Sequence, residues 1–105
     1  MEKLKNHKGH NSTLVLRPAD AKETTEAWAL AMANTATPTA LILSRQNITD
    51  LPEGNDYSQA AKGAYIVAGS DENADVILVA SGSEVSTLVA GAELLRKDGV
   101  KCRIV

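Results

Sequence analysis

The sequence "PTALILSRQN", residues 38–47, places an apolar run directly before three polar side chains. The run covers residues 40–43 and contains only Ala, Leu and Ile, a composition and length typical of a strand buried on both faces. Ser44, Arg45 and Gln46 then follow, with a permanently charged guanidinium in the middle. This stretch therefore predicts a dry strand that carries a polar cluster at its carboxyl end.

The residues before this strand predict another strand and a helix. "TLVLRP", residues 13–18, is a short apolar run closed by a proline, as at the end of a strand. Asp20 and Glu23 then have the spacing of a capping box, and apolar residues recur at helical spacing up to about Asn34, with Trp28 expected in the core. Strand, helix and strand in this order predict a right-handed crossover between two parallel strands.

This crossover indicates where chemistry is expected. In open α/β sheets, ligands bind outside the carboxyl ends of the strands. Arg17 follows the first strand and Arg45 follows the second, so both are expected at that edge. Asp20 is interpreted as a helix cap rather than a catalytic acid, and a pairing with Arg17 stays open.

The second half of the sequence predicts a similar unit. Residues 47–61 lack periodicity and collect turn formers, which is typical of a linker. Strands are expected at 62–70 and 76–80, and "SGSE", residues 81–84, predicts a second capping box and a helix that ends near Gly99. "VKCRIV" would then start another strand. The predicted fold class is α/β, with two partial βαβ units, mainly parallel strands, and a chain that looks truncated.

The same "GSEV" turn has two interpretations. Its backbone amides could bind an anion at the helix N-terminus. A capping turn is favoured instead, because the carboxylate of Glu84 discourages an anion there.

Composition and charge exclude several classes of function. The 105 residues carry 11 basic and 13 acidic side chains, a formal net charge of −2, and the basic residues are scattered, so a nucleic-acid partner is not expected. No apolar stretch approaches the ~20 residues of a membrane span, and no signal peptide is recognisable. The single cysteine, Cys102, is expected to be a buried, reduced thiol. We therefore expect a cytoplasmic protein without a membrane partner.

The first 11 residues are polar and contain several lysines. Such a segment buries little apolar surface, so residues 1–11 are expected to be disordered. His7 and His10 are three residues apart, but no further ligand completes a metal site.

Four stretches together resemble the central part of transketolase. They are "LRPADAKET", "PTALILSRQN", "AKGAYIV" and "ADVILVASGSEVS". The combination is more specific than any one motif. The resemblance implies that residues 1–56 correspond to the end of the pyrimidine-binding domain and residues 57–105 to the start of the C-terminal domain.

The family resemblance also implies a role for the polar cluster. It makes Arg45 a ligand of a sugar phosphate, with Ser44 and Gln46 as supports. The alternative is an arginine that only pairs or extends along the sheet edge. Transketolases transfer a two-carbon ketol unit between sugar phosphates, in the pentose phosphate pathway, with thiamine diphosphate and a divalent metal such as magnesium, as homodimers.

The sequence departs from the family where the cofactor would bind. The Gly-Asp-Gly motif that holds the diphosphate and metal is absent from these 105 residues. We therefore expect no cofactor binding and no transketolase activity from this chain alone, and self-association through its uncovered apolar faces. An alternative is a self-standing α/β binding module, or a split-gene product that pairs with a cofactor-bearing chain. Related synthases and dehydrogenase subunits are a third, less favoured possibility.

Overall fold

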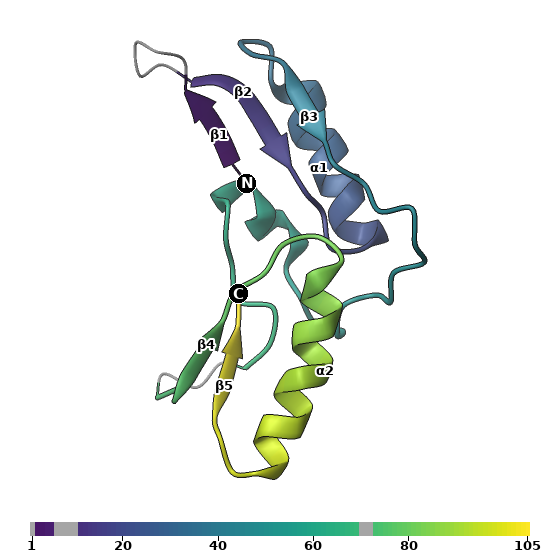
Figure 1. The fold of residues 1–105 in the computed structure, drawn as a ribbon. Helices are drawn as coiled ribbons and strands as arrows, with labels where there is room; N and C mark the ends of the chain where they lie inside the picture. The colour runs from purple at the N-terminus through teal and green to yellow at the C-terminus, as the bar shows by residue number, and fades with distance from the viewer. Residues whose placement is uncertain (1, 6–10, 70–72) are drawn as a thin grey trace.

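The structure is a computed structural model that describes residues 2–5, 11–69 and 73–105. Two α/β units follow one another along the chain (Figure 1). The N-terminal unit contains β1 (Glu2–Lys5), β2 (Asn11–Leu16), α1 (Ala21–Ala33) and β3 (Thr39–Leu41). A 3-10 helix, η1 (Tyr57–Lys62), precedes the C-terminal unit, which contains β4 (Val76–Leu78), α2 (Glu84–Lys97) and β5 (Cys102–Ile104).

The N-terminal unit contains the predicted crossover. β2 and β3 are parallel, with Leu16 opposite Leu41, and α1 connects them. Asp20 is the N-cap of α1 and accepts a hydrogen bond from the Glu23 backbone N–H at 2.8 Å, while the Glu23 carboxylate accepts from Ala19 N–H at 2.7 Å. The predicted capping arrangement is therefore present, with Ala19 in place of Asp20 as the donor to the glutamate.

The start of the chain differs from the prediction of disorder for residues 1–11. Glu2–Lys5 form β1, which pairs antiparallel with β2, so that Leu4 stands opposite Thr13. The free edge of β2 offers unpaired backbone donors and acceptors to a neighbouring segment, whatever the side chains of that segment. The prediction of disorder considered only the buried apolar surface and not these backbone hydrogen bonds. His7 and His10 lie outside the described residues.

The C-terminal unit is a complete crossover, because β4 and β5 are parallel and α2 joins them. Gly99 follows the end of α2 with a φ of 82°, as expected for a helix-ending glycine. Of the strand expected at residues 62–70, the described residues form only an isolated bridge between Ala68 and Ile104, while Lys62 ends η1 and Gly63 is its C-cap. Cys102 is buried in β5, as predicted.

Trp28 is not the core residue that the helical pattern predicted. Its side chain is 53% exposed, whereas neighbouring Ala27 is 4% exposed and packs on Leu14 and Leu16. The helix therefore contacts its small sheet through a narrow stripe of side chains. Trp28 follows Ala27 and is rotated by about 100° around the helix axis, so its indole lies outside that stripe.

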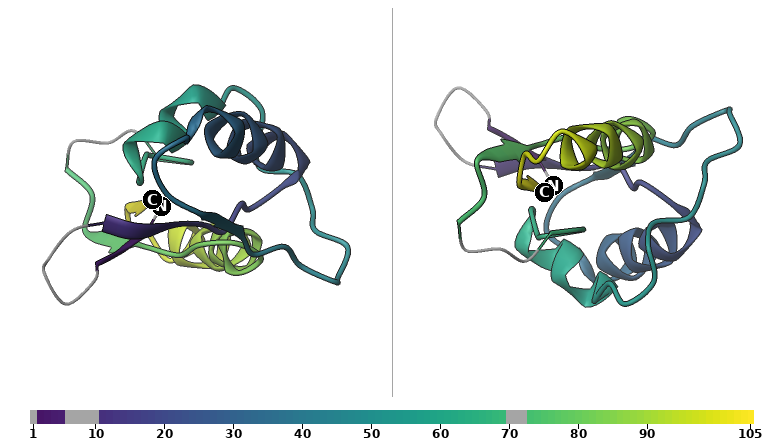
Figure 2. Two further views of the ribbon diagram at one scale, coloured as in Figure 1. Left: turned by 90° about the horizontal axis from the view of Figure 1, so that it is seen from above. Right: turned by 90° about the horizontal axis from the view of Figure 1, so that it is seen from below.

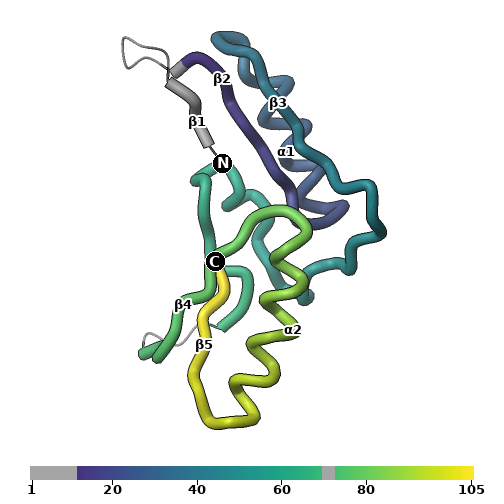
Figure 3. The backbone as a smooth tube through the Cα atoms, viewed as in Figure 1, coloured from purple at the N-terminus to yellow at the C-terminus, as the bar shows by residue number. Residues whose placement is uncertain are grey.

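The two units are joined by a small shared core. Ala19 from the turn before α1, Leu51 from the connecting segment and Val85 from α2 are buried together. Viewed along the long direction, α1 and η1 lie on one side of the molecule and α2 on the other (Figure 2). The segment between β3 and η1 runs without regular structure along the edge of both units (Figure 3).

The whole chain is elongated, with extents of 46 × 30 × 22 Å and a radius of gyration of 15.1 Å. A compact domain of this length would have a radius of about 13 Å. The molecule is therefore more elongated than a compact domain of this length.

Candidate functional site

The polar clusters at the carboxyl ends of β2 and β3 lie side by side. Ile42 N–H donates to the Leu16 carbonyl at 2.9 Å, so the chain leaves both strands at the same level. Arg17 and Pro18 follow one strand, and the segment containing Arg45 follows the other. The expected edge of the sheet is therefore formed. The prediction of a dry strand up to Leu43 is wrong, however: β3 ends at Leu41, and Ile42 and Leu43 are 50% and 52% exposed, because β3 lies at the edge of its sheet.

These clusters border a surface cavity of about 380 Å³. Residues from both units line it. They are Arg17, Pro18, Ile42, Leu43, Ser44, Arg45 and Gln46 from the N-terminal unit and its connection, and Gly82, Ser83 and Glu84 from the start of α2. All three sequence-predicted site residues, Ser44, Arg45 and Gln46, thus line a single cavity.

Arg45 is exposed at this cavity. Within residues 2–5, 11–69 and 73–105, no hydrogen bond or ion pair occupies its guanidinium. Its five N–H donors therefore have no partner among the described residues, and their planar arrangement suits carboxylate and phosphate oxygens.

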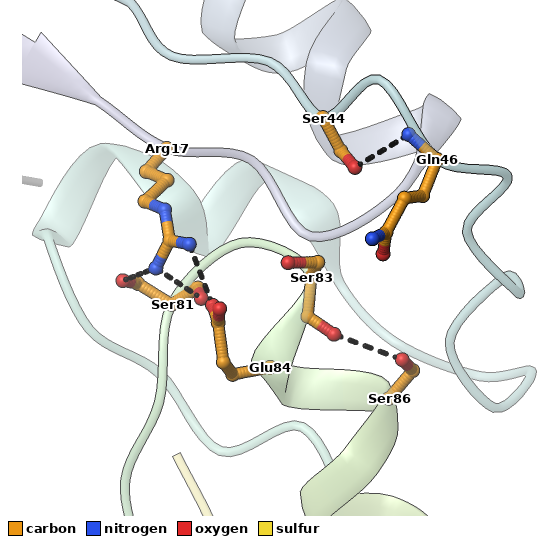
Figure 4. A network of polar contacts seen from close by, with 7 residues as sticks. All are labelled: Arg17, Ser44, Gln46, Ser81, Ser83, Glu84 and Ser86. Carbon is orange, nitrogen blue, oxygen red and sulfur yellow. Dashed lines mark hydrogen bonds and ion pairs between the residues drawn. The ribbon is translucent and has the colours of Figure 1, made fainter.

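Ser44 shapes the turn that carries Arg45. Its hydroxyl oxygen accepts a hydrogen bond from the Gln46 backbone N–H at 3.0 Å (Figure 4). Such a serine turn constrains the backbone of the intervening residue, Arg45, although this segment is neither helix nor strand. Figure 4 also shows Ser44 and Gln46 across from the first turn of α2. The serine hydroxyl therefore acts on the backbone of the turn.

Arg17 is engaged in contacts that the sequence interpretation missed. It forms an ion pair with Glu84 at 2.7 Å, and its Nη1 donates to the Ser81 carbonyl at 3.0 Å and to Ser81 Oγ at 3.2 Å (Figure 4). The pairing of Arg17 with Asp20, which had stayed open, is replaced by these contacts.

The predicted capping box at residues 81–84 is wrong. Ser83, not Ser81, is the N-cap of α2, and its side chain forms no capping hydrogen bond. Ser81 and Glu84 instead face Arg17. A side-chain partner from the other unit has replaced the local partner, and no signal within the "SGSE" stretch distinguishes the two.

The charges around the cavity favour an anion. Two arginines and one glutamate line it, and the glutamate is paired with Arg17. The hydrogen bond from Arg17 holds the pKa of the Glu84 carboxyl below its ordinary value, so that carboxyl stays ionised and paired. Arg45 is then the positive charge without a partner among the described lining residues.

Asp20 lies outside this cavity, in a buried network that joins the connecting segment to α1. It is 3% exposed, and its Oδ2 accepts from Leu51 N–H at 3.0 Å and from the Tyr57 hydroxyl at 2.8 Å. Burial and the bond to Asp20 raise the pKa of Tyr57 to about 12. Every role visible here is structural, in agreement with the cap predicted for Asp20.

A larger cavity, of about 580 Å³, lies between the units. Its lining is mainly aliphatic, with Glu23 and Tyr65 among the few polar groups. Burial raises the pKa of Glu23, although its hydrogen bond from Ala19 N–H opposes the shift. Because Glu23 already caps α1, this cavity is less suited to a charged ligand than the smaller one.

Potential metal ligands do not gather in the part of the chain that the structure describes. No group of three or more His, Cys, Asp or Glu side chains there could hold a metal ion. We therefore derive no step through a metal or a cofactor. No helix in the described ranges combines the length and apolar character needed to cross a membrane.

Comparison with known proteins identifies relatives of this chain. The family model described as "Transketolase-like TK C-terminal domain" matches residues 63–105. "Probable transketolase" of Streptococcus pneumoniae serotype 4 is 50% identical over 91 residues, which are 87% of this chain and 14% of the relative. Transketolase of Halalkalibacterium halodurans is 46% identical over 93 residues, with the same shares.

Solved structures give the same result. A Pichia stipitis transketolase variant in complex with fructose-6-phosphate matches with a TM-score of 0.82 and 39% identity, over 92% of this chain and 14% of that chain. Transketolase from Campylobacter jejuni matches with a TM-score of 0.73 and 33% identity, over 92% of this chain and 15% of that chain. The chain thus spans about one seventh of the length of these proteins. In sequence and in fold, it is a member of the transketolase group, and its residues 63–105 match the C-terminal domain of that family.

Proposed function

We propose that this chain contributes a sugar-phosphate site to a transketolase, with Arg45 as the phosphate ligand. The observation that carries the proposal is the unpaired Arg45 guanidinium at a cavity whose glutamate is already neutralised by Arg17. A phosphate accepts bidentate, charge-assisted hydrogen bonds from such a fork. Ser44 supports the site through the turn, and Gln46 lines the same cavity.

The relatives support this choice of ligand. Pichia stipitis transketolases have been solved in complexes with fructose-6-phosphate, sedoheptulose-7-phosphate and xylulose-5-phosphate. All three are sugar phosphates, so phosphate is their common charged group. We infer that the same class of ligand binds at Arg45.

The reaction proposed for the complete protein is the family reaction. It transfers a two-carbon ketol unit between sugar phosphates of the pentose phosphate pathway, with thiamine diphosphate and a divalent metal, in a cytoplasmic homodimer. The part played by the present residues is limited to binding and orienting the phosphate end of the sugar. Binding energy gained there, away from the reacting carbon, helps to orient the sugar.

The division of the chain is part of this proposal. Residues 1–56 would belong to the pyrimidine-binding domain and residues 57–105 to the C-terminal domain. The elongated, two-unit shape supports it, as does the start of the family match at residue 63. The cavity would then lie at a contact between domains.

A direct binding experiment tests the role of Arg45. Fructose-6-phosphate is titrated calorimetrically into the 105-residue chain and its Arg45→Met variant, with Arg96→Met as the matched control. Arg96 pairs with Glu93 on α2, away from the cavity. We expect loss of Arg45 to weaken binding at least about tenfold, since hydrogen bonds to charged groups contribute about 1.5–3 kcal/mol, and Arg96→Met to leave affinity unchanged. Equal affinities of wild type and Arg45→Met would rule out the phosphate role.

A chimera tests the reaction. The matching segment of the Streptococcus pneumoniae relative is replaced by residues of this chain, and ketol transfer is assayed. The chimera should be active, and Arg45→Met in it should raise KM for sugar phosphates more than it lowers kcat. The 105-residue chain, supplied with thiamine diphosphate and magnesium, should show no transfer, because it lacks the Gly-Asp-Gly motif.

A binding module remains the second candidate, favoured by the large apolar side chains on the surface. Val79 is 71% exposed and Ile77 is 56% exposed. Such exposed side chains can bind a partner protein or a second copy of this chain. A chain that binds a cofactor-bearing partner but shows no affinity for fructose-6-phosphate would support this candidate over the first.

A further inference from the structure

The contact between Arg17 and residues 81–84 uses both backbone and side chain. The Arg17 carbonyl accepts a hydrogen bond from Gly82 N–H at 3.1 Å. The guanidinium of the same residue reaches Ser81 at 3.0 and 3.2 Å and Glu84 at 2.7 Å. One residue at the end of β2 therefore holds three of the four residues that lead into α2.

Gly82 shows how close this contact is. A Cβ added to Gly82 would lie 2.9 Å from Arg17 Cγ and Nε and 3.0 Å from Cζ. Its φ of 63° also lies in the left-handed region that favours glycine. The arginine side chain thus lies directly against the backbone of Gly82. A residue with a side chain at this position would require a shift of Arg17 or of the turn.

The same turn forms one wall of the cavity that contains Arg45. Gly82, Ser83 and Glu84 line the cavity on the side of the C-terminal unit. Because the donors of Arg17 are occupied by Ser81 and Glu84, Arg17 is less available than Arg45 to a ligand. Its ion pair also cancels the charge of a carboxylate that would repel a phosphate.

We propose that Arg17 is a positioning residue, which holds the first turn of α2 against the sheet edge and neutralises Glu84, so that the cavity accepts an anion at Arg45. This inference rests on the proposed phosphate role of Arg45. It adds that the site is assembled from both units and depends on a residue that does not itself bind the phosphate. The competing view is that Arg17 is a second phosphate ligand.

The experiment measures geometry and affinity in the same variants of the 105-residue chain. Spin labels at Met32→Cys on α1 and Leu94→Cys on α2, both well exposed, report the distance distribution between the units in a Cys102→Ala background. Fructose-6-phosphate affinity is measured by calorimetry. The variants are Arg17→Met, Arg17→Lys and Arg45→Met.

The proposal predicts that Arg17→Met broadens the distance distribution and weakens binding about tenfold. Arg17→Lys should also broaden it, because an ammonium group lacks the fork that reaches Ser81 and Glu84 together. Arg45→Met should weaken binding at least about tenfold with an unchanged distribution. Tyr57→Phe serves as a control, since it removes a hydrogen bond to Asp20 away from the cavity. It should lower stability without changing affinity.

Two results would overturn the inference. One is an unchanged distance distribution in Arg17→Met together with weaker binding, which would make Arg17 a direct ligand. The other is a broadened distribution with unchanged affinity, which would make the contact structural only. Failure of the proposed function is distinguishable, because wild type and Arg45→Met would then bind equally, whatever the distances.

Discussion

Arg17 and Glu84 form an ion pair at 2.7 Å that joins the carboxyl end of β2 to the first turn of α2. The pair links two units that are far apart in the sequence. It stands at the wall of the candidate cavity, beside Gly82 and opposite the turn that carries Arg45. The contact therefore connects the arrangement of the two units to the charge of the site.

The pH dependence of this pair follows from the lowered pKa of Glu84. In the folded state the hydrogen bond from Arg17 lowers that pKa below its ordinary value of 4.5. A lowered pKa gives a stability contribution that is present above the unfolded pKa and is lost as the pH falls through the folded one. We expect the difference in unfolding free energy between wild type and Glu84→Gln to be largest at neutral pH and to vanish in acid.

Urea unfolding at several pH values below and above 4.5 measures this difference. Glu53→Gln, an exposed residue on the connecting segment, provides the control. A difference that stays constant from neutral to acid pH would contradict the assigned role of the ion pair.

Gly82→Ala and Gly91→Ala should have opposite effects. Gly82 has a φ of 63° and its added Cβ would meet Arg17, so alanine there should cost about 1–3 kcal/mol. Gly91 is inside α2 with nothing within 4 Å of an added Cβ, so alanine there should stabilise by about 0.5–1 kcal/mol. Thermal and urea unfolding compare the two variants. If both substitutions destabilise equally, the close approach at Gly82 is not the cause.

Asp20→Ala should be among the most destabilising single substitutions. It removes the N-cap of α1, leaves the Leu51 N–H without its acceptor in a buried position, and leaves the partly buried Tyr57 hydroxyl without its acceptor. A lost cap costs about 0.5–2 kcal/mol and an unsatisfied buried donor about 1–3 kcal/mol, so a total of about 2–4 kcal/mol is expected. Tyr57→Phe should cost about 1 kcal/mol. A loss from Asp20→Ala no larger than that from Tyr57→Phe would show that the network is not cooperative.

Exposed apolar side chains should cause self-association of the 105-residue chain. Val79 is 71% exposed and Ile77 56% exposed, next to a small sheet with open edges. Ile77→Glu and Val79→Asp should lower the average mass seen by sedimentation equilibrium at high concentration. Glu93→Asp, an exposed change on α2, should leave it unaltered. A wild-type chain that sediments as a compact monomer at every concentration would contradict this prediction.

The local pattern of residues determined most of the helices and strands. The apolar run before Ser44, the cap at Asp20 and the glycine after α2 all act within a few residues, so the sequence alone predicted a crossover and the start of a second one. It also placed Arg45 beyond the carboxyl end of the second strand, although β3 ends at Leu41 and the apolar run continues two residues further.

Tertiary structure decided what these elements face. Trp28 is exposed because its small sheet offers only a narrow contact to α1, and β1 exists because β2 has a free edge. Ser81 and Glu84 face Arg17 rather than each other, since a partner from the other unit offers a stronger, charged interaction than a local cap. Contacts between segments distant in sequence leave no periodic signal, and the wall of the cavity is formed by such contacts.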